Sequence, residues 1–325
     1  MDVRKVLTTA ETADWLGTRD RFLLLTHRRP DGDAIGCAAA LAQGLHELGK
    51  TAYVLHNPEV TPRYLRFIKD YWAPEGYTPD HIVMIDTASE ELFPKNARNY
   101  AGSISLCIDH HPSNTYYAKQ TCLVESRASC GEIIYDILHA MAGSISAATA
   151  EKLYVALTTD TGCFAFANTT SNTLRVASLL VDAGAPHRDL NKLLFRMKTR
   201  GRIKIEGMVF SGLEFHFGGS VAISTITRSM IAEAAATEDD LDDISSLPGS
   251  IEGVLAGITI RELSGDSDCK VSVRSGPLVN SNDICARFGG GGHPMAAGFS
   301  QKSSVRDVRN SLLVVLPDYL PPQQS

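Results

Sequence analysis

The sequence lacks several features that would place it in common protein classes. Its seven cysteines form no CxxC pair and are odd in number. This argues against a structural zinc knuckle and a disulfide framework, and it favours free thiols in a reducing cytoplasm. No apolar run approaches the roughly 18 residues that a membrane helix needs. The N-terminal residues carry acids and no long apolar stretch, so we expect neither a signal peptide nor a membrane anchor.

Positive charge is also in deficit. The 325 residues contain 31 Lys and Arg against 37 Asp and Glu, which gives a formal net charge of −6. A protein that binds long duplex nucleic acid without regard to sequence needs a basic face, so we exclude that class. With 44% hydrophobic residues the chain can bury a substantial core, and its length predicts about two domains.

Short apolar runs alternate with helical patterns in the first half of the chain. The runs at residues 21–26, 51–55, 81–86 and 103–109 predict strands. The patterns at residues 34–48, 129–140, 147–158 and 172–183 predict helices, and Ser129 followed by Glu132 is typical of a capping box. Continuous apolar runs that alternate with helices predict a parallel sheet covered on both faces.

The pattern changes after residue 187. A segment rich in Lys and Arg predicts a connecting helix, and residues 221–227, 254–262 and 269–274 predict strands of another sheet. We therefore expect an α/β protein with a parallel-sheet domain over residues 1–187, a connecting helix over 188–213 and a smaller α/β domain over 214–325. An exposed apolar face on the connecting helix would indicate a homodimer.

Acids and imidazoles follow three of the predicted strands. The first strand is followed by His27, Asp31 and Asp33, the third ends at Asp86, and the fourth ends at residues 109–111, Asp-His-His. Asp160 follows a predicted helix. Ligands of open parallel sheets bind at the carboxyl ends of the strands, so these groups are expected on one edge. Packed together without cations, they would repel one another and lose hydration.

Divalent cations remove this conflict. A set of carboxylate oxygens and imidazole nitrogens without thiolates suits manganese, and magnesium second, better than structural zinc. The set is too large for one ion with open positions, whereas two ions that share a bridging carboxylate would use all of it. Ion pairs about 3.5–4 Å apart serve phosphate-ester hydrolysis. The residues alone therefore predict a binuclear phosphoesterase.

A glycine run marks the second predicted domain. Residues 289–292 are all glycine and His293 follows them. Glycines leave backbone N–H groups unshielded, so we expect an anion-binding concavity here. Arg274 ends a predicted strand, where its guanidinium could contact phosphate in bidentate fashion.

Together these motifs resemble the DHH phosphoesterase superfamily, in particular its two-domain nanoRNase and pAp-phosphatase branch. Residues 27–33 (HRRPDGD) are similar to the first family motif, Asp86 to the second, Asp109-His110-His111 to the signature third, and Asp160 to the fourth. The GGGGH run at residues 289–293 resembles the glycine-rich motif of the DHH-associated domain. The motifs stand in family order and span nearly the whole chain.

The resemblance implies a role for each matched residue. One ion would be held by His27, Asp31 and Asp86, and the other by Asp33, Asp86, His110 and Asp160, with Asp86 as the bridge. Asp109 would orient an imidazole or the backbone turn, and His111 would contact the scissile phosphate or donate to the leaving oxygen. The substrate's far end would be held by Arg274, Gly291, Gly292 and His293.

The resemblance also implies a function. We expect a cytoplasmic phosphodiesterase that uses two Mn²⁺ ions, with Mg²⁺ as the alternative. Its substrates would be RNA or DNA oligonucleotides of two to five nucleotides and bisphosphate nucleotides such as pAp, and it would bind neither membranes nor long duplexes. Other candidates are a pApA or cyclic di-AMP phosphodiesterase, a RecJ-like single-strand exonuclease, a pyrophosphatase or polyphosphatase, and a non-catalytic nucleotide sensor. Loss of a metal ligand would indicate the sensor, and none is missing.

Overall fold

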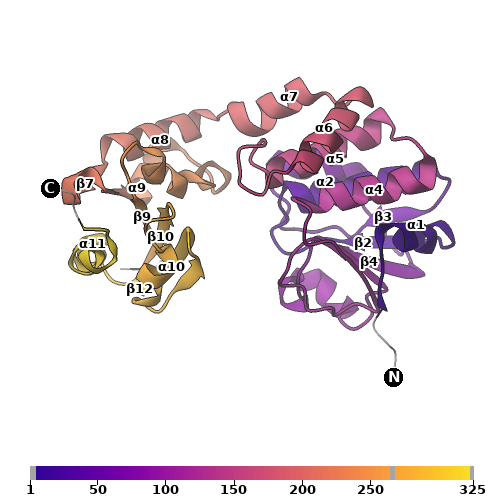
Figure 1. Cartoon of the computed structure of the whole chain (residues 1–325), viewed down its shortest axis with the longest axis horizontal. Coiled ribbons are helices and arrows are strands. Elements are labelled where there is room, and N and C mark those ends of the chain that lie inside the picture. The colour runs from indigo at the N-terminus through magenta and orange to yellow at the C-terminus, as the bar shows by residue number, and fades with distance from the viewer. Residues whose placement is uncertain (1–4, 264–267, 323–325) are drawn as a thin grey trace. The chain divides into compact units, whose positions relative to one another are not determined.

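The computed structural model describes residues 5–263 and 268–322, and the chain divides into two compact units, residues 1–197 and 198–325 (Figure 1). The first unit contains a parallel sheet flanked by helices, and the second contains a separate mixed sheet. The α/β class that the sequence predicts is confirmed. No helix within the described ranges is both long enough and apolar enough to cross a membrane.

The sheet of the first unit has the strand order β1-β6-β5-β4-β2-β3, and all its pairs are parallel. The strands are β1 Lys5–Val6, β2 Phe22–Leu25, β3 Ala52–Val54, β4 His81–Ile85, β5 Leu106–Asp109 and β6 Gln120–Leu123. Side chains alternate between the faces of a strand. On β2, Phe22 and Leu24 belong to one core cluster while Leu23 and Leu25 belong to another, so both faces are buried.

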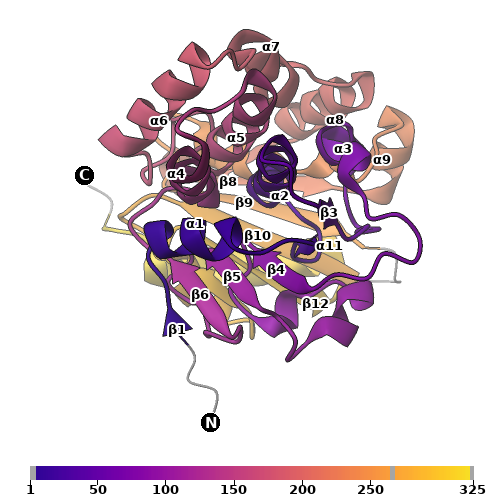
Figure 2. The same ribbon diagram turned by 90° about the vertical axis from the view of Figure 1, so that its right-hand side faces the viewer.

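Helices cover one face of this sheet, and Figure 2 shows α1, α2 and α4 along it. The helices of this unit are α1 Thr9–Gly17, α2 Gly32–Glu47, α3 Pro62–Ile68, α4 Cys130–Ala142, α5 Ala147–Asp160, α6 Ser171–Asp182 and α7 His187–Asn191. Gly36 allows helices α2 and α5 to pack closely, since a Cβ atom at this position would lie 2.5 Å from the Lys152 carbonyl oxygen. Short 3₁₀ turns around Phe93 and Ala97 cover the opposite face.

The second unit has a sheet of order β11-β12-β10-β9-β8-β7, in which β8 and β9 are parallel and the other pairs are antiparallel. Its strands are β7 Glu214–His216, β8 Val221–Ile226, β9 Ala256–Glu262, β10 Asp268–Ser275, β11 Gly291–His293 and β12 Ala296–Lys302. Its helices are α8 Arg200–Ser211, α9 Arg228–Ala234, α10 Ser281–Ala286 and α11 Val305–Val315. This unit has its own core, in which Ile258, Val271 and Leu312 are buried.

The prediction of a single connecting helix over residues 188–213 is wrong. Helix α7 continues into a π-helical turn, Lys192–Arg196, and Met197 then adopts an extended backbone with φ −81° and ψ 130°. Helix α8 starts afresh because the Thr199 side chain accepts the backbone N–H of Arg202, which is an N-cap. The boundary between the two units falls in this break.

Candidate active site

Three neighbouring strands deliver the candidate residues to one edge of the parallel sheet. His27 follows β2, Asp86 follows β4, and Asp109 ends β5. Strands β2 and β4 are neighbours in the sheet. From β2 the chain continues to β3 on one side, and from β4 it continues to β5 on the other side, so the strand order reverses between β2 and β4. This is the topological switch point of the sheet, where ligands of doubly wound folds bind.

The six predicted metal ligands lie together at this edge, in two groups. The first contains His27, Asp31 and Asp86, and the second contains Asp33, His110 and Asp160; within each group the ligand atoms lie within 4.8 Å of one another. Asp86 faces both groups. Its Oδ2 atom is 3.9 Å from His27 Nε2, and its Oδ1 atom is 3.5 Å from His110 Nε2.

In the neutral form of both imidazoles, the hydrogen-bond partners place the unprotonated nitrogen toward the carboxylates. His27 Nδ1 lies 2.8 Å from the Arg28 carbonyl, and His110 Nδ1 lies 3.2 Å from the Arg127 carbonyl. A carbonyl only accepts, so we assign the proton of each neutral ring to Nδ1 and the lone pair to Nε2. His110 Nε2 then faces Asp33 Oδ2 at 3.8 Å and Asp160 Oδ2 at 3.5 Å. Lone pairs that face carboxylates favour a cation between them.

The electrostatics of the cluster also indicate missing positive charge. Burial and the Asp33 carboxylate raise the pKa of Asp86 well above its usual value. Burial and the Asp160 carboxylate likewise raise the pKa of Asp33, and burial raises the pKa of Asp160 to about 7. Asp86 Oδ1 is buried and accepts no hydrogen bond from any described residue. The donor set therefore fits divalent cations.

The backbone at Asp86 is unusual. Its φ angle is 54°, in the left-handed region that residues with a Cβ atom rarely adopt. Backbone strain of this kind costs on the order of 1–3 kcal/mol and persists where the surrounding structure enforces it. Here the Asp86 N–H donates to the Ile108 carbonyl on β5, which fixes the carboxylate between the two groups.

Asp109 serves its neighbours instead of pointing into the two ligand groups. Its Oδ1 atom accepts His111 Nδ1–H at 2.7 Å and the His110 N–H at 2.8 Å. Its Oδ2 atom accepts the Asn114 side-chain amide at 2.6 Å. The hydrogen bond and the charge of Asp109 raise the pKa of His111 although burial opposes this, so the imidazolium form of His111 is favoured. His111 Nδ1 lies 3.6 Å from Asp86 Oδ1.

Asp33 has a structural contact that the sequence did not predict. Its Oδ2 atom accepts the Cys130 N–H at 2.7 Å, and its Oδ1 atom accepts the Gly131 N–H at 3.0 Å. Asp33 thus caps the first turn of α4 from another helix. The capping box expected at Ser129 and Glu132 is wrong, because the Ser129 side chain makes no cap hydrogen bond.

Several residues that hold the site were missed by sequence reasoning. Asn168 donates to the Asp160 carbonyl at 3.0 Å and to the Ala128 carbonyl at 3.1 Å. Glu132 accepts the Ala128 N–H at 3.2 Å and the Thr173 hydroxyl at 2.7 Å. Two of these contacts, from Asn168 to Ala128 and from Thr173 to Glu132, join residues about 40 positions apart in sequence, so no local pattern signals them. Asn114 carries a weak signal, because Asn soon after a strand is typical of a turn.

The predicted substrate-binding residues lie on β10 and β11 of the second unit, which flank β12. Arg274 on β10 pairs with Ala296 on β12, and Ala296 pairs with His293 on β11. Residues directly opposite one another project to the same face of a sheet, so Arg274 and His293 share a face. Gly291, Gly292 and His293 are exposed.

Three N–H groups of the glycine run are already paired within the second unit, which argues against the anion-binding concavity that the sequence suggested. The N–H groups of Gly289 and Gly290 donate to the Ala286 and Cys285 carbonyls, and that of Gly292 donates to Asn282 Oδ1 at 2.9 Å. Close packing explains two of the glycines, because a Cβ atom at Gly290 would lie 2.3 Å from the Gly298 carbonyl oxygen and one at Gly292 would lie 2.6 Å from the Ala296 carbonyl oxygen.

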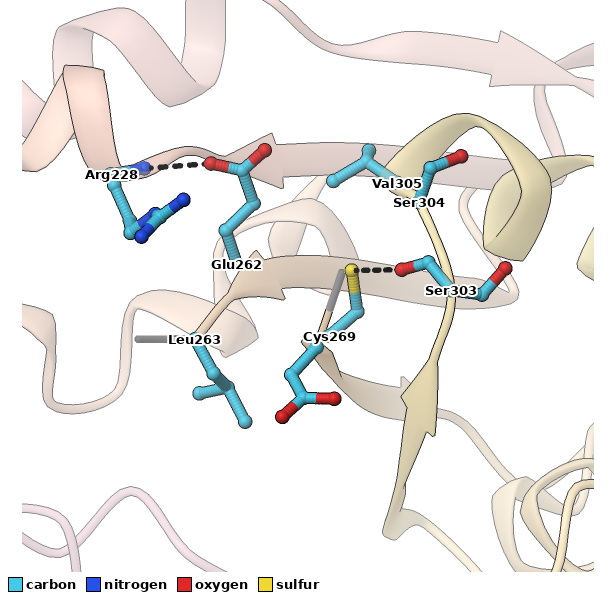
Figure 3. Close-up of a pocket in the computed structure, with 8 residues that line it drawn as sticks. Arg228, Glu262, Leu263, Cys269, Ser303, Ser304 and Val305 are labelled. Atoms are coloured by element: carbon cyan, nitrogen blue, oxygen red, sulfur yellow. Dashed lines mark hydrogen bonds between the residues drawn. The ribbon is translucent and has the colours of Figure 1, made fainter. Parts of the chain in front are cut away.

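A small pocket of the second unit lies away from these residues. Its volume is about 150 Å³, and its lining includes Arg228, Glu262, Cys269 and Ser303 (Figure 3). Strands β9 and β10 are paired along their length. Glu262 and Cys269 lie opposite each other at one end of this pairing, and Arg274 lies near the other end. The pocket therefore contains none of the candidate residues.

Comparison with known proteins agrees with this architecture. Residues 21–158 match the DHH family, N-terminal domain, and residues 218–315 match the DHHA1 domain. The chain is 33% identical to the bifunctional oligoribonuclease and PAP phosphatase NrnA of Thermus thermophilus, over 86% of this chain and 83% of that protein.

Two solved structures share the fold. An exopolyphosphatase-related protein from Bacteroides fragilis superposes with a TM-score of 0.84 at 22% identity, over 96% of each chain. The exonuclease RecJ bound to manganese superposes with a TM-score of 0.53 at 12% identity, over 97% of this chain and 95% of that one. At these identities the likeness concerns the fold alone.

Fold and cluster together define a two-unit α/β protein with a cluster of carboxylates and imidazoles able to hold a metal at the switch point of its parallel sheet. With both domain matches and a relative at 33% identity, the chain belongs to the DHH family and carries a DHHA1 domain.

Proposed function

We propose that this chain hydrolyses phosphodiester bonds in oligonucleotides of two to five nucleotides and removes a phosphate from bisphosphate nucleotides such as pAp. The observation that carries the proposal is the match, over both domains, to a relative named for these two activities. The clustering of all six candidate ligands supports a catalytic role over a nucleotide-sensing one. Seven free cysteines fit a reducing cytoplasm.

The centre is proposed to hold two Mn²⁺ ions, with Mg²⁺ as the alternative. His27, Asp31 and Asp86 would hold one ion, and Asp33, Asp86, His110 and Asp160 would hold the other. The two oxygens of Asp86 face different groups, which suits a bridging carboxylate. When bound, such ions supply Lewis acidity that polarises the phosphate and lowers the pKa of water.

His111 is proposed to act on the substrate directly. Because Asp109 holds Nδ1–H, the Nε2 atom of His111 is free to donate a proton to a phosphate oxygen or to the leaving oxygen. Asp109 positions the ring and favours its protonated form, as second partners of catalytic histidines do. Asn114 keeps the Asp109 carboxylate in place.

The second unit is proposed to bind the end of the substrate remote from the scissile phosphate. Arg274 would contact phosphate through its guanidinium, and His293 would contact the nucleotide beside it, since both project to one face of the sheet. Gly291 and Gly292 would let the substrate approach the backbone closely, because they present no side chain.

A substrate panel tests the proposal. The purified protein with Mn²⁺ is given pAp, pApA, cyclic di-AMP, a 24-mer RNA and pyrophosphate. We expect fast turnover of pAp and pApA and slow turnover of the 24-mer. Equal rates on the 24-mer and the dinucleotide would favour a RecJ-like exonuclease, and preference for pyrophosphate would reject nucleotide substrates.

The Asp86→Asn variant is the matched inactive control. We expect it to lose more than about 100-fold in rate and at least one bound ion, since even changes to residues that only hydrogen-bond to a metal ligand cost about 10- to 100-fold. Asp14→Asn removes a carboxylate from an exposed position on α1 and should behave as the wild type.

A further inference from the structure

The loop between α5 and α6 carries two phenylalanines with different surroundings (Figure 1). Phe164 packs against the core, and its ring centroid lies 6.3 Å from that of Tyr154. Phe166, two residues later, is 59% exposed. The loop begins directly after Asp160, one of the candidate ligands. An exposed aromatic side chain beside the catalytic cluster has no role in the mechanism described so far.

The backbone of this loop is held in an unfavourable conformation. Gly162, Cys163 and Phe164 have successive φ angles of 54°, 55° and 69°, and two of these residues carry a Cβ atom. Such strain persists only where the surroundings enforce it, and it concentrates at ligand-binding sites. The Cys163 N–H donates to the Thr158 carbonyl at 2.7 Å, and the Phe166 N–H donates to the Thr161 carbonyl at 3.0 Å.

The Phe166 ring rests on the backbone of Gly162. A Cβ atom at Gly162 would lie 2.4 Å from a ring carbon of Phe166, so only glycine allows this contact. Gly162 is two residues from Asp160, and two Cα–Cα steps span at most about 7 Å. Asn168 closes the loop by donating to the Asp160 carbonyl at 3.0 Å. The ring is therefore fixed close to the cluster while much of its surface faces solvent.

A cation lies near the same loop. Burial raises the pKa of the Cys163 thiol, and the nearby charge of Arg196 opposes that shift. Arg196 is exposed, at the end of the π-helical turn. An aromatic ring and a guanidinium are two groups that bind single-stranded nucleotides, the ring by stacking on the base and the guanidinium by pairing with the backbone phosphate.

We propose that Phe166 is a specificity-determining residue that stacks on the base of the nucleotide attached to the scissile phosphate. The inference rests on the proposed function, because it presumes that this phosphate lies at the cluster that includes Asp160. A rigid ring already fixed on Gly162 loses little freedom when a base stacks on it. Every base has a π face, so the contact selects nucleotides over simple phosphate esters without selecting a base.

Steady-state kinetics of Phe166→Ala test the proposal with two substrates, pApA and the same dinucleotide backbone without bases. We expect KM for pApA to rise about tenfold or more, and KM for the abasic substrate to stay unchanged. Phe166→Trp should restore KM for pApA. Phe210→Ala is the matched control, because Phe210 on α8 is also exposed, at 46%. An unchanged KM for pApA, or equal changes for both substrates, would overturn the proposal.

A binding experiment separates this inference from the proposed function. The fluorescence of Phe166→Trp is titrated with adenosine 5′-monophosphate in EDTA, with the wild type as the baseline for Trp15 and Trp72. Quenching in the variant alone supports stacking, and no quenching overturns it. If the wild type hydrolyses neither dinucleotide, the proposed function fails, and this titration still decides whether Phe166 stacks on a base.

Discussion

Asp86 and Asp109 follow neighbouring strands, yet their carboxylates have opposite surroundings. Asp109 receives donors on both oxygens; burial works against ionisation, but the hydrogen bonds from His111 and Asn114 leave the pKa of Asp109 below its usual value. Asp86 Oδ1 receives no donor among the described residues, and burial raises its pKa. Asp109 therefore positions its neighbours, whereas the buried Asp86 oxygen without a donor favours a cation. The sequence places both residues at a strand end and cannot separate these roles by residue type.

The Asn114→Ala variant tests the positioning role of Asp109. Without the Asn114 amide, the Asp109 carboxylate can rotate away from His111, so we expect kcat to fall about 10- to 100-fold. Bound metal, measured by elemental analysis, should stay at the wild-type level, because Asn114 contacts none of the proposed ligands in the described structure. Asn96→Ala, which removes a hydrogen bond to the His56 carbonyl, is the control. Loss of metal together with activity would contradict the positioning role.

At the scale of elements, the sequence predicts what the hydrophobic pattern controls. Strands β2, β4 and β5 are continuous apolar runs, and locating them places His27, Asp86 and residues 109–111 at one sheet edge. The hydrophobic pattern does not predict strand β6, because its first two residues, Gln120 and Thr121, are polar. The pattern does not predict strand β11 either, because two of its three residues are glycine, which disfavours strands.

Contacts between elements were not predictable in the same way. The cap of α4 by Asp33 joins residues almost 100 positions apart, so the local pair of Ser129 and Glu132 gave the wrong partner. The glycine run differs for another reason, since its contacts are local. The N–H groups of Gly289, Gly290 and Gly292 are satisfied by Ala286, Cys285 and the Asn282 side chain of α10, three to ten residues earlier in the sequence.

Two variants of Asp33 separate its cap from its proposed role as a ligand. Asp33→Ala leaves the N–H groups of Cys130 and Gly131 without an acceptor in a buried place, whereas Asp33→Asn keeps one acceptor oxygen. In EDTA we expect Asp33→Ala to be less stable than Asp33→Asn by about 1–3 kcal/mol in urea unfolding. Both variants should lose activity with Mn²⁺. Equal stability of the two variants would show that the cap contributes nothing.

Asp240 in the second unit gives a pH-dependent prediction. Asp240 is 6% exposed and accepts the Thr237 N–H at 2.8 Å and the Thr199 hydroxyl, which holds the start of α8. Burial works against ionisation, but the hydrogen bonds from Thr199 and Thr237 leave the pKa of Asp240 below its usual value. The folded state therefore favours the ionised form. The contribution of the ionised Asp240 carboxylate to folding stability is present above the unfolded pKa of about 3.9. It is lost as pH falls through the lower pKa of the folded protein.

The Asp240→Asn variant should accordingly be less stable than the wild type at pH 7, by about 1–3 kcal/mol. The difference should narrow at pH 3, below the unfolded pKa of about 3.9, because the unfolded chain then takes up a proton on this carboxyl more readily than the folded protein does. Thermal unfolding followed by far-UV circular dichroism at both pH values measures this, with Asp318→Asn at an exposed position as the control. A stability difference between the two proteins that stays constant with pH would show that the loss comes from the shape of the side chain and not from the charge of the carboxylate.

At the scale of the whole molecule, the two units have separate cores. All six proposed ligands lie in the first unit, and so do both tryptophans, Trp15 and Trp72. Trp15 is buried in the core of the first unit, and Trp72 packs against that core. Tryptophan fluorescence therefore reports on the unit that would bind the ions.

Metal binding should stabilise this unit specifically. Without ions the buried carboxylates repel one another, and a ligand that binds only the folded state adds about 2.7 kcal/mol when its concentration is 100 times Kd. For a unit of this size that corresponds to a rise in Tm of roughly 5–10 °C. We expect the tryptophan-detected Tm to rise by this amount when Mn²⁺ replaces EDTA, and to rise less with Zn²⁺ at equal concentration. In Asp86→Asn the rise should largely disappear, because that variant lacks the proposed bridge between the ions. A wild-type Tm that Mn²⁺ leaves unchanged, or an equal rise in Asp86→Asn, would show that the cluster does not hold the ions as assigned.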